Sequence, residues 1–138
     1  DANLRTPGLQ DLLTPSRPVS GLSDYLMADD KRPPELIAHP QPNLSLLYAG
    51  TPTENSAELL AKQRFKALLD ESTRSFDLTI VDCAPAANYG DARRVASILR
   101  HALVVVRQDV SFSADVKTLV QELQADGVNV VGTFLNIV

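Results

Sequence analysis

The sequence predicts an α/β fold built around a mostly parallel β-sheet. Three short apolar runs recur in the second half of the chain, at Phe76–Val81, Ala102–Val106 and Val128–Leu135. Two segments with helical spacing of apolar residues, Asp91–Arg100 and Ser113–Ala125, alternate with these runs. Buried strands that alternate with helices are typical of a parallel sheet joined by right-handed crossovers.

The first half of the chain contains shorter elements. Its apolar spacing predicts short helices at Leu9–Leu13 and Leu22–Met27 and a short strand at Leu44–Leu47. Four prolines fall within Lys31–Pro42, which therefore predicts an irregular connection.

The longest predicted helix covers Asn55–Ser72. Asn55 or Ser56 caps its start, and its apolar stripe comprises Leu59, Leu60, Phe65, Leu68 and Leu69. Downstream, Ser113 is the predicted N-cap of the last helix and Gly127 its stop.

Composition restricts the class of protein. The 138 residues fit one domain, since domains average roughly 150 residues. The net charge of -4 gives no basic surface for a phosphate backbone, which argues against nucleic-acid binding. No apolar run approaches the ~20 residues that span a bilayer, and the segment from Asp1 to Arg5 does not resemble a signal peptide.

Cys83 is the only cysteine, which excludes an internal disulfide and favours a reducing cytoplasm. As a nucleophile it would need His39 or His101 as its base, because these are the only histidines. The alternative is that Cys83 is a buried, small apolar residue.

Asp82 directly follows the apolar run that ends at Val81. Ligands of open α/β sheets bind at the carboxyl ends of strands, where a carboxylate can hold Mg²⁺ through water. The alternative is a strand-end aspartate that caps a turn. A second acidic group, Asp1, lies close to Arg5 in the first turn of the chain. The carboxylate could bind a metal and the arginine a phosphate. The alternative is an ordinary charged terminus.

Five segments, in this order, resemble the ATPase domain of the bacterial tyrosine kinases that accompany the chain-length regulators of capsule and exopolysaccharide export. They are DANLRTP, PNLSLLYAGTPTENSAELLAKQRFKALL, FDLTIVDCAPAANYGDA, ALVVVRQ and VVGTFLN. The resemblance covers nearly the whole chain. It implies a three-layer P-loop NTPase-like fold, of the MinD and ParA type, with Mg²⁺ and ATP as cofactors.

The resemblance also implies roles for single residues. DANLRTP matches an acidic motif usually written D-x-D-x-R-x-P, so Asp1 would be the catalytic and metal-associated carboxylate, with Arg5 beside it. Asn3 departs from the usual second aspartate, and an amide cannot accept a proton as a carboxylate does. FDLTIVDCAP matches the Walker B strand, which makes Asp82 the Mg²⁺ residue.

Further matches are less direct. Asp91 matches an aspartate common in the loop after Walker B, and Asn136 a position near the nucleotide base, where its amide could pair with adenine. Both are therefore predicted nucleotide-binding residues. Cys83 and Ala84 stand where the family more often has Thr-Pro-Pro.

No G-x-x-x-x-G-K-[ST] loop is present, because the six glycines never cluster and no lysine follows one. In the family this loop precedes the D-x-D motif, and a tyrosine-rich tail follows the domain. Residues 1–138 are therefore predicted to be one partial kinase domain, N-terminally truncated and inactive by itself.

The resemblance implies that the intact protein is a cytoplasmic tyrosine autokinase. It would transfer the γ-phosphoryl of MgATP to tyrosines of a neighbouring subunit at the inner face of the membrane. Its partners would be further copies of itself and the membrane chain-length subunit, with no nucleic acid. Two alternatives stay open: a non-catalytic scaffold that binds the chain-length subunit, and a partitioning ATPase of the same superfamily.

Overall fold

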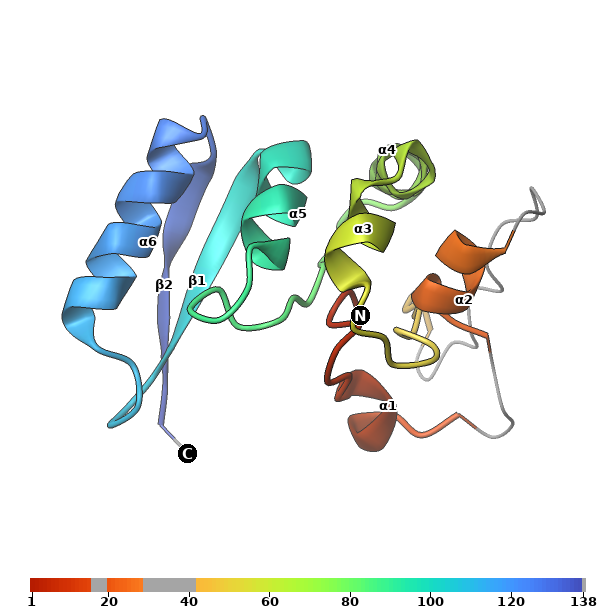
Figure 1. Ribbon diagram of the computed structural model, residues 1–138, viewed down its shortest axis with the longest axis horizontal. Helices are drawn as coiled ribbons and strands as arrows, with labels where there is room; N and C mark the ends of the chain where they lie inside the picture. Colours follow the sequence, from red (N-terminus) through yellow and green to blue (C-terminus); the bar gives the residue numbers. More distant parts are fainter. Residues whose placement is uncertain (16–19, 29–41, 138) are drawn as a thin grey trace. The chain divides into compact units, whose positions relative to one another are not determined.

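The computed structural model describes residues 1–15, 20–28 and 42–137 (Figure 1). These residues form two compact units, Asp1–Ala84 and Pro85–Val138. None of the helices in the described ranges combines the length and the hydrophobicity that a membrane span needs.

The second unit has the predicted β-α-β arrangement (Figure 1). α5 (Asp91–Leu99) precedes β1 (His101–Arg107), and α6 (Ser113–Ala125) connects β1 to β2 (Asn129–Asn136). The two strands pair in parallel. This unit confirms the predicted strands and helices to within two residues at each end.

The core of the second unit lies between the two strands and the two helices. It contains one buried residue from each helix and strand region, namely Ala96, Val104, Leu123 and Val128. Burial of these side chains explains why the apolar spacing of the sequence was sufficient to predict the elements. Leu103, Val105 and Phe134 of the same strands are exposed.

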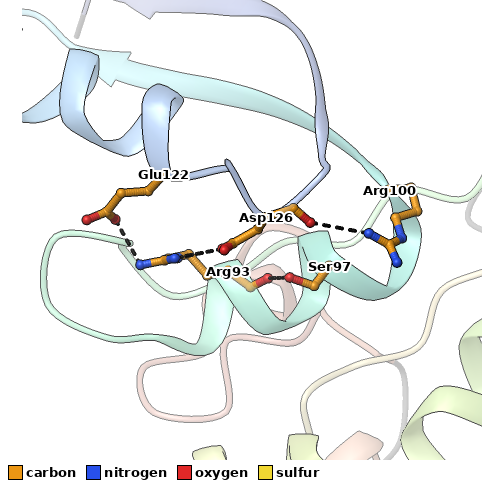
Figure 2. A network of polar contacts seen from close by, with 5 residues as sticks. All are labelled: Arg93, Ser97, Arg100, Glu122 and Asp126. Carbon is orange, nitrogen blue, oxygen red and sulfur yellow. Dashed lines mark hydrogen bonds and ion pairs between the residues drawn. The ribbon is translucent and has the colours of Figure 1, made fainter. Parts of the chain in front are cut away.

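An arginine-centred network joins α5 to the end of α6 (Figure 2). Arg93 donates to Asp126 Oδ2 from Nε at 3.0 Å and from Nη2 at 2.7 Å, and its Nη1 donates to Glu122 Oε2 at 3.0 Å. The hydrogen bond to Asp126 is the main reason why the pKa of Arg93 is raised. Arg100 adds a bond to the Asp126 carbonyl at 3.2 Å. The network holds the two helices together on their polar side.

Of the two predicted ends of α6, the start differs from the prediction and the end agrees with it. Phe112, and not Ser113, is the N-cap of α6, so the Ser113 hydroxyl makes no capping bond there. Gly127 has φ +76° and ends the helix as predicted.

The first unit is built from short helices and irregular segments. Its helices are α1 (Leu9–Leu12), α2 (Leu22–Met27), α3 (Ser56–Ala61) and α4 (Gln63–Ser75). Its most deeply buried large side chains are Leu4, Leu26, Leu60 and Phe65. The two predicted short helices are confirmed, whereas most of Lys31–Pro42 lies outside the described residues.

The predicted helix at Asn55–Ser72 is two helices, because the backbone of Lys62 is extended with ψ 141°. The break has a structural use. Lys62 Nζ donates to the Leu26 carbonyl at 2.8 Å, and Arg64 Nη1 to the Ala28 carbonyl at 2.5 Å. These bonds satisfy the last carbonyls of α2, which have no partner within that helix.

The predicted strand at Phe76–Val81 was wrong, since the structure assigns no strand to this described segment. Leu78 is 75% exposed and Ile80 82% exposed. A strand requires a hydrogen-bonded neighbour, and apolar spacing alone does not reveal whether one is present. The predicted strand at Leu44–Leu47 is likewise reduced to a single bridge at Leu46.

A close backbone contact connects α2 to the turn at Tyr48–Gly50. Leu22 N donates to the Tyr48 carbonyl and Ser23 N to the Ala49 carbonyl, both at 2.8 Å. Gly50 has φ +81°, and a Cβ added there would lie 2.4 Å from Asp24 Oδ2. Glycine is therefore required at this turn.

Candidate functional site

Asp1 is held by three hydrogen bonds within the first unit. Its α-amino group donates to the Leu47 carbonyl at 2.7 Å. Its carboxylate accepts the backbone N–H of Asn3 at 2.9 Å and that of Leu9 at 3.2 Å. The Asp1 carboxylate is thus fixed by the two ends of the segment that leads into α1.

Asp82 lies next to this segment. The backbone N–H of Ala2 donates to the Asp82 carbonyl at 2.8 Å. This bond joins the segment that begins at Asp1 directly to Asp82. The Asp82 residue is exposed. Two carboxylate residues that are 81 positions apart in the sequence are therefore brought to one place.

The electrostatics of the site reflect this proximity. Burial lowers the pKa of the Asp1 α-amino group, because desolvation penalises its charged form. The negative charges of Asp82 and Cys83 oppose that shift, in this order of size. Asp82 therefore interacts electrostatically with the α-amino group of a chain that begins at Asp1.

Asn3 closes a tight turn with Thr6. Asn3 Nδ2 donates to the Thr6 carbonyl at 2.7 Å, and the Thr6 N–H donates to Asn3 Oδ1 at 3.1 Å. Sequence reasoning treated Asn3 as a departure from a motif and overlooked this turn. The signal was present, because asparagine commonly bonds backbone groups a few residues further along the chain.

Arg5 lies within this turn and is directed to the segment before α3. Its Nη1 donates to the Glu54 carbonyl at 3.1 Å and lies 3.5 Å from Glu54 Oε2. The arginine side chain is only 13% exposed, whereas that of Glu54 is 96% exposed. Thr53 N also donates to the Leu4 carbonyl at 2.8 Å, which fixes the same two segments.

The remaining predicted site residues belong to the second unit. Asp91 is buried, with 2% exposure, at the start of α5. Asn136 ends β2 opposite Arg107, and its carbonyl accepts the Gln108 N–H at 3.0 Å. The structure thus groups Asp1, Arg5 and Asp82 in one unit, and Asp91 and Asn136 in the other.

Cys83 is partly buried, and its Sγ lies 3.8 Å from the Val81 carbonyl. Of its two predicted bases, His39 lies outside the described residues. His101 Nδ1 lies 3.2 Å from the Leu99 carbonyl. The burial is compatible with the interpretation of Cys83 as a small apolar residue.

Comparison with known proteins identifies relatives along nearly the whole chain, although no family model matches. The chain is 31% identical over 136 residues to the tyrosine-protein kinase etk of Escherichia coli, which is 99% of this chain and 19% of the relative. The solved kinase domain of that enzyme superposes with a TM-score of 0.88 at 30% identity, over 100% of this chain and 54% of the domain.

The chain is homologous to the bacterial tyrosine kinases. Another relative, the succinoglycan biosynthesis transport protein ExoP of Rhizobium meliloti, is 30% identical over 139 residues, which is 99% of this chain and 18% of ExoP. The chain spans about a fifth of the length of these curated relatives. The likeness to the kinase domain confirms the predicted α/β, P-loop-NTPase-like fold.

Asp1 and Asp82, the two carboxylate residues that match the kinase motifs, are compatible with a magnesium ion. Asp1 and Asp82 offer hard carboxylate oxygens, which Mg²⁺ prefers, and a bound Mg²⁺ usually keeps several waters and few protein ligands. In the described parts of the chain no group of three or more histidine, cysteine or acidic side chains is placed to hold a metal. Two carboxylate residues are too few for a fully protein-coordinated ion and are compatible with a hydrated Mg²⁺.

Proposed function

We propose that this chain supplies the metal-side carboxylates of a bacterial protein-tyrosine autokinase. The observation that carries the proposal is the junction between the Asp1 segment and Asp82, made by the Ala2–Asp82 backbone bond of 2.8 Å. Phosphoryl transfer depends on positioning and on charge stabilisation, and paired carboxylates beside an arginine suit that task. The homology to tyrosine-protein kinase etk supports the choice of reaction.

In this proposal each residue has a distinct task. Asp1 and Asp82 hold Mg²⁺ through its water shell, and the bound ion supplies neutralisation of the phosphate charge. The Asp1 carboxylate also accepts the proton of the tyrosine hydroxyl, as a base fixed by Asn3 N–H and Leu9 N–H. Arg5 is held at the edge of the site by Glu54 and faces the developing negative charge once phosphate is bound.

Two tasks fall to the second unit and to residues outside this chain. Asn136 binds the adenine edge through its amide, and Asp91 contributes to nucleotide binding from the start of α5. The phosphate-binding loop is proposed to come from another part of the full-length protein, with residues 1–138 forming part of a single kinase domain. The coverage of 54% of the solved kinase domain supports this.

The proposed setting is polysaccharide export. The protein would act at the inner face of the bacterial membrane, phosphorylating tyrosines on neighbouring copies and associating with a membrane chain-length subunit. The similarity to ExoP, a succinoglycan biosynthesis transport protein, supports this setting. Each phosphorylation would add nearly two negative charges at a subunit contact and so favour separation of the copies.

Asp82→Ala in the full-length protein tests the proposal. We expect at least a 100-fold loss of tyrosine phosphorylation, measured by mass spectrometry of the purified protein after incubation with MgATP. Asp77→Ala is the matched control, because Asp77 is an exposed aspartate in the same segment. Full activity of Asp82→Ala would exclude this role for Asp82.

A scaffold without catalysis is the second candidate. It is favoured by Asn3, whose amide is bonded to Thr6 and cannot serve as a base. A wild-type protein that binds the chain-length subunit but forms no phosphotyrosine with MgATP would establish the scaffold in place of the kinase.

A further inference from the structure

The side chain of Asn3 bonds the backbone of Thr6 in both directions. Nδ2 donates to the Thr6 carbonyl at 2.7 Å, while Oδ1 accepts the Thr6 N–H at 3.1 Å. The Thr6 hydroxyl lies 3.3 Å from Nδ2 and 3.4 Å from Oδ1. A single carboxamide therefore closes the turn between residues 3 and 6.

A carboxylate at position 3 cannot reproduce this pairing. An ionised aspartate only accepts hydrogen bonds, so it would keep the bond from Thr6 N–H but lose the one to the Thr6 carbonyl. Two acceptor oxygens would then face each other at the distance of a hydrogen bond, 2.7 Å in this structure. The turn would then be held only by the bonds that Thr6 donates, and it would be less tightly closed.

The closed turn contains Arg5 and directly follows Asp1, the two predicted catalytic residues. On one side, Asn3 N–H donates to the Asp1 carboxylate at 2.9 Å. On the other side, Arg5 is enclosed within residues 3–6 and reaches Glu54. The backbone of Asn3 thus contacts Asp1, and the turn that its side chain closes contains Arg5.

We propose that Asn3 is a positioning residue: its carboxamide closes the turn that contains Arg5 and from which the Asn3 backbone N–H bonds the Asp1 carboxylate, and it is not a weakened metal ligand or base. The structural part of this inference, closure of the turn, stands on the hydrogen bonds alone. Its catalytic consequence rests on the proposed kinase function.

Closure of the turn is tested by NMR on the ¹⁵N-labelled chain. In Asn3→Asp and in Asn3→Ala the Thr6 amide resonance should shift, because both variants lose the bond from the Asn3 carboxamide to the Thr6 carbonyl. Asn129→Asp, an exposed change of equal charge at the start of β2, should leave the Thr6 resonance unchanged. A Thr6 amide that is insensitive to both Asn3→Asp and Asn3→Ala would overturn the inference.

The catalytic consequence is tested by tyrosine phosphorylation in the full-length protein. We expect kcat of Asn3→Asp to be roughly tenfold below wild type at pH 8, equivalent to one hydrogen bond of about 1.4 kcal/mol. The Mg²⁺ midpoint of Asn3→Asp should not decrease.

The opposite result is equally informative. If Asn3→Asp lowers the Mg²⁺ midpoint and increases kcat, position 3 is a weakened metal ligand and the positioning role is wrong. If the wild-type protein forms no phosphotyrosine, the kinase proposal fails, and the Thr6 amide shifts still decide whether Asn3 closes the turn.

Discussion

The two units of this chain are stabilised in different ways. Pro85–Val138 consists of regular elements that are adjacent in sequence, with a shared apolar core and the Arg93 network on its polar side. Asp1–Ala84 also has buried apolar side chains, but its irregular segments are held to one another by individual backbone bonds between distant parts of the chain. The bonds Asp1–Leu47, Leu4–Thr53 and Ala2–Asp82 each join segments more than forty residues apart.

This difference explains where the candidate chemistry lies. Side chains on irregular segments can point in directions that a helix or strand does not allow, but a few long-range bonds must then hold them. Asp1, Arg5 and Asp82 are of this kind. Their geometry is therefore more sensitive to remote changes than that of Asp91 or Asn136, which are at the ends of regular elements.

Removal of a core side chain from the first unit should have the largest effect, and it should destabilise that unit more than the second. Phe65 is 1% exposed, and Phe65→Ala should cost about 3–5 kcal/mol of unfolding free energy, measured by urea denaturation. The amides of Ala2 and Thr53 should lose hydrogen-exchange protection, while those of β1 retain it. Equal loss in both units would show that they unfold as one.

The turn that receives α2 should be the next most sensitive position. Gly50→Ala should destabilise the chain by about 1–3 kcal/mol, because Gly50 has φ +81° and its added Cβ would contact Asp24. Gly8→Ala is the control, since no heavy atom lies within 4 Å of the Cβ that it would add. A Gly50→Ala melting temperature equal to that of Gly8→Ala would contradict the assigned contact.

The smallest expected effect is a pH dependence in a chain that begins at Asp1. Burial lowers the folded-state pKa of the α-amino group, so above its usual value of about 8 the group is neutral in both states. As the pH falls from 8 through the folded pKa, the unfolded chain binds the proton more readily and stability decreases. Urea denaturation between pH 6 and 9 measures this slope. N-terminal acetylation should remove its α-amino component, and an unchanged slope would contradict the assignment.

The regular unit was predictable because its signals are local. Val95, Val104 and Leu123 each belong to a run of apolar residues with helical or strand spacing, and their burial follows from that spacing. Asp82 could be assigned a role from the family motif around it. The break at Lys62 and the exposure of Ile80 could not be predicted, because both depend on which segments lie nearby in space.

The candidate site shows the same limit. Sequence pattern selected Asp1, Arg5 and Asp82, and the structure joins the segment of Asp1 and Arg5 to Asp82 through the Ala2–Asp82 backbone bond. Whether these residues bind metal and catalyse phosphoryl transfer stays a prediction.

The most direct test of the central claim is calorimetric Mg²⁺–ATP binding to the full-length protein in a double-mutant cycle. Asp1→Asn and Asp82→Asn should each weaken binding about tenfold or more. The loss of binding free energy in the double variant should be smaller than the sum of the two single losses, because both carboxylates act on one ion. Strictly additive losses, or no loss in either single variant, would contradict a shared metal site.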